Sequence, residues 1–447
     1  MEGIVHYTPH TQKDITAMLN DIGVADIDEL FSTIPESLRL KTPLSFPDDS
    51  GKSEQELRQS IQPLLSVKNE RSLQGAGIYH HYRPSVIDWV LSRGEFLTAY
   101  TPYQPELSQG LLQALYEYQT LICRLTGMEV SNASVYDGST ATVEVVRMLS
   151  EISRKSHIAV AATLHPEYKA VLHTANPAGR FEIQEIPARN GIVTPETITE
   201  TITDQTGGII LQYPNFYGCI EQLDACIAVA HAAHIPVAVA VYPTALGLLK
   251  APGELGAHIV YGEGQPLGLP VSYGGATFGF IATRKKHVRC LPGRICGATV
   301  DRNGQRGFVL TLQAREQHIR RQKASSNICS NQMLYALGGA VYLSALGWNG
   351  LNAVARTSAD KAHRFVEHCT ALPGISLRYT HPYFNEFVLD IPNMNSIRTA
   401  IKERLHAEFG IPLARFTPND TGLLIAVTEM TDEQLLTDIP ALIGELL

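Results

Sequence analysis

The chain has 447 residues, more than one hydrophobic core normally supports, so two or more packed units are expected. Hydrophobic residues make up 44% and charged residues 18%, which is typical of a globular protein rather than a disordered or fibrous one. The formal net charge of −8 argues against a general nucleic-acid partner.

Targeting and membrane signals are not visible in the sequence. The amino terminus has neither a basic nor an apolar signal region, and the longest apolar run, 236–249, is too short to span a bilayer. Seven scattered cysteines without a CxxC pair predict reduced thiols rather than disulfides or a metal site. A cytoplasmic protein with no membrane segment and no metal is therefore expected.

Residues 1–70 show a polar, mostly helical pattern, which predicts an N-terminal helical arm. Thr11 suits the N-cap of its first helix, and Gly23 suits the end of that helix.

From about residue 110, helices alternate with short apolar segments rich in β-branched residues. These predicted strands lie at 157–163, 207–214, 235–243, 257–262 and 278–283. Strands that are apolar on both faces and separated by helices predict a mainly parallel sheet covered on both sides. Residues 71–332 are therefore expected to form a large α/β domain.

Residues 333–447 change to a pattern that predicts a small α+β domain. After a long helix, a strand is expected at 385–392, a helix that ends at Gly410, and a strand at 421–428. The residues 431–434 have the sequence of a capping box, which predicts that the last helix begins there.

The stretch "YDGSTA" places Gly138, Ser139 and Thr140 at the start of an amphipathic helix. Free N–H groups at such an end can bind a phosphate. The alternative is that Asp137 or Ser139 only caps the helix.

The loop 96–110 contains Tyr100, Tyr103 and Gln104 together with Pro102 and Pro105, a combination suited to stacking a ring or lining a narrow channel. Packing in a core or an interface is the alternative for these tyrosines. His81, which follows His80 in "IYHHYRP", belongs to a pair that is usually structural.

Residues 284–323 contain eleven Lys or Arg but only two acidic residues, Asp301 and Glu316. Such a segment in an acidic protein could steer an acidic partner, hold phosphate or carboxylate, or form a solvated face whose counter-charges come from elsewhere in the fold.

The turn in "HIVYGEGQPLGLPVSYGG" follows an apolar strand, where α/β enzymes often place a reactive residue. This turn has Gln265 and Pro266, and no side chain in it can act as a nucleophile before Ser272.

Several long motifs, taken together, resemble a known family. They are "GEFLTAYTPYQPELSQG", "NASVYDGSTA", "GEGQPLGLPVSYGG", "PGRICGATVDRNGQRGFVLTLQAREQHIRRQKASSNICSNQ" and "YFNEFVLDIP". The chain is similar to subunit 1 of the two-subunit glycine dehydrogenase (decarboxylating), the P-protein of the glycine cleavage system. The resemblance covers nearly the whole chain and implies the aspartate-aminotransferase-like fold (fold type I) of pyridoxal-phosphate (PLP) enzymes.

The resemblance implies that a partner, subunit 2, carries the Schiff-base lysine at the turn that holds Gln265 and Pro266 here. Neither side chain can condense with the cofactor aldehyde, so PLP is expected to be bound covalently by the partner. PLP enzymes of this fold also place a carboxylate beside the pyridine nitrogen, where this chain has Tyr242.

The implied reaction is the decarboxylation of glycine and transfer of the aminomethyl group to the lipoyl arm of H-protein, by a heterotetramer of two of each subunit. His81, Tyr100, Tyr103 and Gln104 are the residues expected to face the shared pocket or the lipoyl channel. Ser325, Ser326 and Asn327 are expected to reach the cofactor phosphate across the interface.

Two other functions stay open at this stage. The chain could be a stand-alone PLP enzyme that uses Lys250, or a non-catalytic structural or regulatory module.

Overall fold

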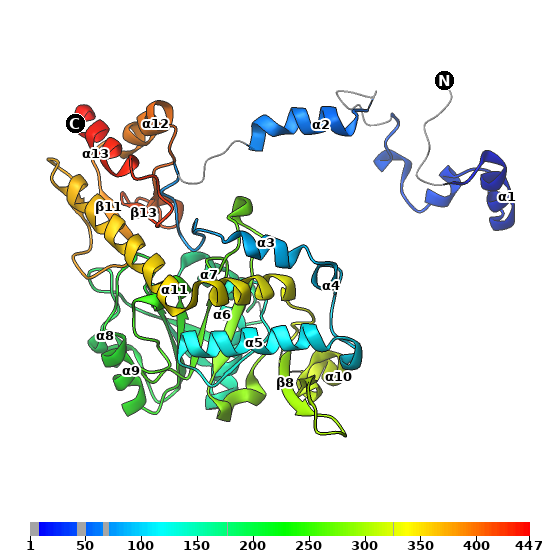
Figure 1. The fold of residues 1–447 in the computed structure, drawn as a ribbon, viewed down its shortest axis with the longest axis horizontal. Helices are drawn as coiled ribbons and strands as arrows, with labels where there is room; N and C mark the ends of the chain where they lie inside the picture. The colour runs from blue at the N-terminus through cyan, green and yellow to red at the C-terminus, as the bar shows by residue number, and fades with distance from the viewer. Residues whose placement is uncertain (1–8, 43–50, 66–70, 177, 325) are drawn as a thin grey trace. The chain divides into compact units, whose positions relative to one another are not determined.

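The computed structural model describes residues 9–42, 51–65, 71–176, 178–324 and 326–447. The chain divides into two compact units, 1–67 and 68–447 (Figure 1). The predicted site residue Ser325 lies outside the described residues.

The first unit contains α1 (Gln12–Ile22) and α2 (Glu54–Ile61). The Thr11 side chain accepts from Asp14 N and the Asp14 carboxylate accepts from Thr11 N, while Gly23 ends α1 in the left-handed conformation. Both sequence predictions for this helix are therefore confirmed. None of the described side chains of this unit is buried.

A seven-stranded sheet forms the centre of the second unit. Its strand order is β1 (Val130–Ser131), β7 (Gly279–Thr283), β6 (Ile259–Glu263), β5 (Val237–Val241), β4 (Thr206–Tyr213), β2 (His157–Ala161) and β3 (Glu182–Ile186). The strands from β6 to β3 are parallel, whereas β7 and β1 pair antiparallel. The predicted mainly parallel α/β architecture is confirmed. The sequence pattern does not predict β3, because this edge strand is largely exposed.

Helices cover both faces of this sheet, as the alternation along β5 shows. Val237, Val239 and Val241 pack in one hydrophobic core, and Ala238 and Ala240 pack in another. The remaining helices of this part are α3 (Ser85–Leu91), α4 (Gly94–Leu97), α5 (Gln109–Thr126), α6 (Gly138–Ser153), α7 (Pro166–Thr174), α8 (Pro195–Thr201) and α9 (Leu223–Ala232). Side chains of α6 and α7 join the alanine face, and those of α3, α5, α8 and α9 join the valine face.

A second, antiparallel sheet follows near the carboxyl terminus. It has the order β10 (Ser376–Leu377), β11 (Glu386–Asp390), β13 (Leu423–Ala426) and β12 (Ile411–Pro412). The helices α12 (Met394–Leu405) and α13 (Leu435–Leu446) pack on it and share its hydrophobic core (Figure 1). The predicted small α+β part is thus present.

The long helix α11 (Met333–Thr370) joins the two parts of this unit. Its residues 336–351 contribute to the core of the large sheet, and its residues 362–369 contribute to the core of the small one. The backbone of Gly347 is not helical, so the helix is kinked there. Because α11 belongs to both cores, the domain division after residue 332 remains a prediction.

Two predicted helix boundaries near the carboxyl terminus are wrong. The helix α12 ends at Leu405 with His406 in the left-handed conformation, whereas Gly410 stands directly before β12. The helix α13 begins at Leu435, after the predicted capping box, because the Thr431 hydroxyl accepts from Thr428 N and so closes a turn.

The basic segment 284–323 contains a hairpin of β8 (Ile295–Val300) and β9 (Arg306–Thr311), then the short helix α10 (Gln317–Arg320). In the part of the chain that the structure describes, no helix has the length and apolar character needed to cross a membrane.

Candidate active site

The candidate site lies at the carboxyl ends of the central parallel strands, where ligands of open α/β sheets usually bind. Here β5 leads into Tyr242, β6 ends at Glu263, and the first turn of α6 begins at Gly138. The pocket between them has only about 30 Å³ that water can occupy. Ligand pockets typically have roughly 300–1,000 Å³. Side chains of this protein, including Tyr79 and Tyr168, therefore fill most of the space.

Gln265 is 1% exposed, and its side chain is fully hydrogen-bonded. Its Oε1 accepts from Tyr79 N at 2.9 Å, and its Nε2 donates to Tyr79 O at 2.9 Å and to Leu269 O at 2.9 Å. The amide thus pairs with both backbone groups of Tyr79, as a neighbouring strand would. This side chain fastens the loop around Tyr79 to the turn and offers no reactive group.

The carboxylate of Glu263 occupies the first turn of α6. Its Oε2 accepts from Gly138 N at 3.1 Å, and its Oε1 accepts from Gln265 N at 2.9 Å. A Cβ at Gly138 would lie 2.2 Å from the Tyr168 hydroxyl, so glycine permits this close approach. Burial raises the pKa of Glu263 to about 7, although the two N–H donors oppose the shift.

Asp137 decides whether the start of α6 is a phosphate site or a capped helix end. Its Oδ1 accepts from Thr140 N at 2.7 Å and from the Ser139 hydroxyl at 2.5 Å, so the capping interpretation is the one that the geometry supports. A neighbouring pocket at this end is lined by the carboxyl residues Asp137, Glu167 and Glu263. Carboxylates of the chain itself therefore occupy the first turn of α6, where the sequence pattern also allows a phosphate.

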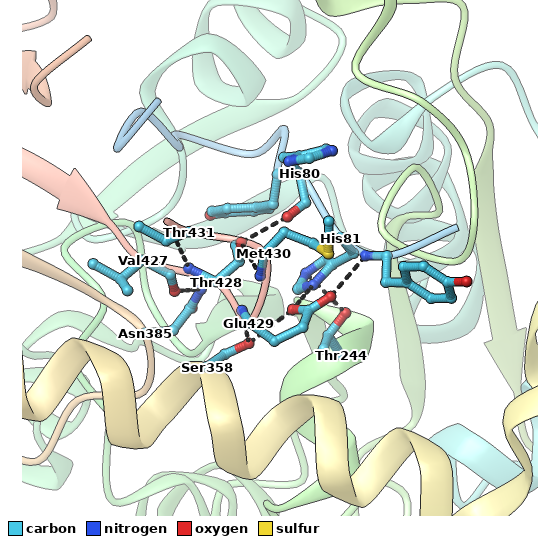
Figure 2. A network of polar contacts seen from close by, with 12 residues as sticks. His80, His81, Thr244, Ser358, Asn385, Val427, Thr428, Glu429, Met430 and Thr431 are labelled. Carbon is cyan, nitrogen blue, oxygen red and sulfur yellow. Dashed lines mark hydrogen bonds and ion pairs between the residues drawn. The ribbon is translucent and has the colours of Figure 1, made fainter. Parts of the chain in front are cut away.

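His81 is buried in a network that joins three parts of the chain (Figure 2). Its Nδ1 lies 2.7 Å from Glu429 Oε2, and its Nε2 is hydrogen-bonded to the Tyr242 hydroxyl and lies 3.4 Å from Thr244 Oγ1. Glu429 follows β13, whereas Tyr242 follows β5. The histidine thus links the small sheet to the end of the large one.

Glu429 holds the other side of this network, between His81 and Ser358 in Figure 2. It accepts from Tyr82 N at 2.7 Å, and it exchanges two hydrogen bonds with Ser358 of α11. Burial works against ionisation of Glu429. The contacts with His81 and Tyr82 N outweigh it and keep the pKa of this carboxyl below its ordinary value.

Tyr79 packs on the side chain that replaces the expected carboxylate. Its ring stacks on Tyr242 with centroids 4.3 Å apart, and its hydroxyl donates to Glu386 Oε2 at 2.7 Å. Glu386, at the start of β11, also accepts from Ala76 N at 2.7 Å. Burial raises the pKa of Glu386 to about 7.

The predicted channel residues Tyr100, Tyr103 and Gln104 lie in one loop on the surface. The tyrosines are 69% and 68% exposed, and Gln104 is exposed as well. Arg294 donates to Thr101 Oγ1 at 3.0 Å and lies over the Tyr103 ring, 5.7 Å from its centroid. Arg294 therefore anchors this loop through Thr101 and the Tyr103 ring, while both tyrosines stay largely exposed. His81 is not part of this group.

Ser326 and Asn327 differ in exposure. Ser326 is buried, its Oγ accepts from Ile328 N at 3.0 Å, and its hydroxyl contacts the Glu144 carboxyl. Asn327 is exposed. Of these two residues, only Asn327 presents its side chain to the surroundings.

Lys250, the lysine considered for a stand-alone enzyme, is exposed and lines a different pocket. Its neighbours there include Leu125 of α5 and Trp348 and Leu351 of α11. This pocket shares no lining residue with the one beside Gln265.

Comparisons with known proteins give the class of fold and then the family. A glutamate decarboxylase from Lactobacillus brevis superposes with a TM-score of 0.66 at 12% identity, over 92% of this chain and 96% of that one. A crystal structure of glycine decarboxylase (P-protein) of the glycine cleavage system, in inhibitor-bound form, superposes with a TM-score of 0.86 at 40% identity, over 99% and 100%. The fold is that of the PLP-dependent enzymes of fold type I, as the sequence predicts.

The sequence relatives are more specific. The family model for "Glycine cleavage system P-protein" matches residues 5–443. The probable glycine dehydrogenase (decarboxylating) subunit 1 of Geotalea uraniireducens is 47% identical over 95% of this chain and 96% of its own length. The Bacillus subtilis protein of the same name is 45% identical over 98% of each. This chain belongs to the glycine cleavage system P-protein family.

The pocket of this chain does not fit PLP. Water can occupy only about 30 Å³ of the space beside Gln265, Gln265 itself is fully bonded, and Tyr242 binds His81 where the resemblance calls for a carboxylate beside the pyridine nitrogen. At α6, carboxylates face the position that a phosphate would require. Ionised carboxyl groups at this position would repel a phosphate.

The sequence pattern does not predict three carboxyl residues of this site, the buried Glu263 and Glu386 and the partly buried Glu429. Glu263 had a detectable signal, because it is the only acidic residue in the stretch 258–275 and directly follows an apolar strand. Glu386 and Glu429 flank the strands of the small sheet, and nothing in their local sequence indicates contact with residues 76–82.

Proposed function

We propose that this chain is the non-lysine subunit of a glycine decarboxylase, and that it completes the active site of a partner subunit that carries PLP covalently. The full-length relationship to proteins named subunit 1 supports this assignment, because such a name implies a second subunit. The complex decarboxylates glycine and transfers the aminomethyl group to the lipoyl arm of H-protein. A heterotetramer of two copies of each subunit is the expected assembly.

The side chain of Gln265 is the observation that carries this proposal. It stands at the turn where a Schiff-base lysine would be required, and all of its polar groups are used on Tyr79 and Leu269. A chain with this turn cannot form the covalent link, so the cofactor chemistry has to come from another subunit. PLP supplies stabilisation of the carbanion in the partner's site.

The contribution of this chain is to shape and orient the shared pocket. Tyr100, Tyr103 and Gln104 form a stiff, exposed aromatic loop, anchored by Arg294. A loop held in this way can cover a neighbouring site and exclude water from it. His81 does not face the surface. Its contacts with Glu429 and Tyr242 hold the wall of the site in position. Asn327 is available to a phosphate across an interface.

Co-expression tests the proposal directly. The chain and a lysine-bearing homologue encoded beside it are expected to co-purify, and only the complex should catalyse exchange of bicarbonate into glycine. Full exchange activity by the lysine-bearing subunit alone would contradict the proposal.

A stand-alone enzyme using Lys250 is the competing function. Incubation of the isolated chain with PLP and borohydride is expected to leave Lys250 unlabelled, because this side chain is exposed and its pocket is not the one at the sheet edge. Stoichiometric label at Lys250 together with decarboxylation by the isolated chain would favour that competitor. A purely structural module is excluded if the complex loses activity when the Tyr103 loop is changed.

A further inference from the structure

The basic segment 284–323 has no role in the function proposed above, and its charges are not balanced within the fold. Among the described residues, none of its eleven Lys and Arg lies within 4.0 Å of a carboxylate oxygen as an ion pair. Fourteen Lys and Arg residues elsewhere in the described chain do form such pairs. In the described chain, the segment's Lys and Arg residues therefore have no counter-charge at ion-pair distance.

Four of these cations line a single surface pocket in which water can occupy about 330 Å³. They are Arg289, Arg315, Arg320 and Lys323. One carboxyl residue, Glu151 of α6, lies in the pocket, and it is hydrogen-bonded with the Cys290 side chain. The formal charge of the lining is thus strongly positive.

Arg315 forms the fixed part of this pocket. Its guanidinium donates to the carbonyl oxygens of Leu291 and Gly293, while its Nε is a buried donor without a hydrogen-bond partner in the described chain. Burial lowers the pKa of Arg315 and outweighs the attraction of the neighbouring Glu316, which reflects the cost of keeping this charge away from water. An anion in the pocket would compensate that cost.

The other cations can move toward a ligand. Arg289, Arg320 and Lys323 are exposed, and of these Arg320 uses its Nε on Ala314 O at 3.1 Å. Guanidinium groups bind phosphate through paired N–H donors, and several of them around one pocket favour a multiply charged anion. Leu312 and Ala314 add a short apolar wall.

We propose that this pocket, formed by Arg289, Arg315, Arg320 and Lys323 with Leu312 and Ala314, is a binding site for a small organic phosphate. The proposal goes beyond the glycine decarboxylase function and does not depend on it. The pocket lies between the carboxyl end of α6 and the segment after β9, whereas the Gln265 site lies at the amino end of α6.

Isothermal titration of the full-length chain at low ionic strength tests the site, with pyrophosphate, inorganic phosphate and acetate as probes. Saturable binding is expected, strongest for pyrophosphate and weakest for acetate, and it should weaken with added salt. The double variant R320Q/K323Q should bind pyrophosphate at least roughly tenfold more weakly, since charge-assisted hydrogen bonds are lost. Arg289→Gln, a single change of an exposed side chain, should weaken it as well.

Arg302→Gln is the matched control, because Arg302 belongs to the same basic segment but lies in the hairpin turn and does not line the pocket. This variant should bind pyrophosphate like the wild type. An equal loss in Arg302→Gln, or no saturable binding by the wild type, would overturn the proposal. Glycine–bicarbonate exchange by the complex is measured separately, so failure of this site leaves the proposed function unaffected.

Discussion

The Gln265 amide pairs with the backbone of Tyr79 through both of its ends, at 2.9 Å each. Tyr79 in turn stacks on Tyr242 and donates to Glu386. One side chain at the end of the central sheet therefore holds a loop that reaches the small sheet. Gln265, which cannot form a Schiff base, thus has a structural role at this turn.

Gln265→Lys is expected to destabilise the chain without giving it a cofactor. A lysine cannot accept from Tyr79 N and would place a charge at a position that is 1% exposed, so a loss of roughly 2–4 kcal/mol in the free energy of unfolding is expected. Urea unfolding measures this loss. Absorbance after addition of PLP, with and without borohydride, measures adduct formation, and a reducible adduct at residue 265 would show that the pocket admits the cofactor.

Glu386→Gln should change the pH dependence of stability. The pKa of Glu386 is raised to about 7 from an ordinary 4.5, mainly by burial, so the folded chain holds a proton that the unfolded chain has released. This contribution is fully present below pH 4.5 and is lost as the pH rises to about 7. The variant does not titrate there. Its stability relative to wild type should therefore rise by roughly 3 kcal/mol between pH 4.5 and pH 8.

Urea unfolding of both proteins at several pH values measures this difference. A constant difference between variant and wild type across that range would contradict the raised pKa of Glu386.

Glu429→Gln should weaken the contact between the small and large sheets. The largely enclosed carboxylate accepts from Tyr82 N and contacts His81, and an amide lacks the charge and the second acceptor oxygen, so a loss of roughly 1–3 kcal/mol is expected near neutral pH. Because the pKa of Glu429 is lowered in the folded chain, its stabilising effect is present above pH 4.5 and disappears as the pH falls below that value. Thermal unfolding at two pH values measures the loss.

Glu433→Gln is the control for this change. Glu433 lies four residues further along and pairs with Arg364 at the surface, where such pairs contribute about 1 kcal/mol or less. A larger loss in Glu433→Gln than in Glu429→Gln would refute the importance of the buried network.

Tyr103→Ala should slow glycine–bicarbonate exchange by the reconstituted complex by roughly tenfold. Loss of the ring would remove a contact that orients the substrate in the shared pocket, and misplaced reactants react more slowly. The isolated chain should unfold almost as the wild type does, since the ring is largely exposed. Tyr103→Phe keeps the ring and should retain most of the activity.

Trp348→Ala is the matched control, since it removes an aromatic side chain of similar exposure from another surface. Its exchange rate should equal that of the wild type. An unchanged rate in Tyr103→Ala would remove Tyr103 from the proposed pocket.

Sequence patterns identified the large sheet because its strands are apolar on both faces, and periodicity records that burial directly. The edge strand β3 is not predicted by this pattern, because its sequence "EIQEI" is mostly exposed. The capping box at 431–434 predicts the wrong start for the last helix. The Thr431 hydroxyl accepts from Thr428 N and closes a turn instead of capping α13. A capping-box sequence does not show which nearby backbone N–H group the Thr431 hydroxyl binds in the folded chain.

The sequence by itself determined the fold class, and with it the missing lysine, because a residue type at one turn decides whether a Schiff base can form. Only the tertiary structure decided that side chains fill most of the pocket beside Gln265, that His81 is buried between Glu429 and Tyr242, and that carboxylates face the start of α6. The two contacts of His81 join residues more than a hundred positions apart. Such contacts depend on how the elements pack, and no local pattern encodes that packing.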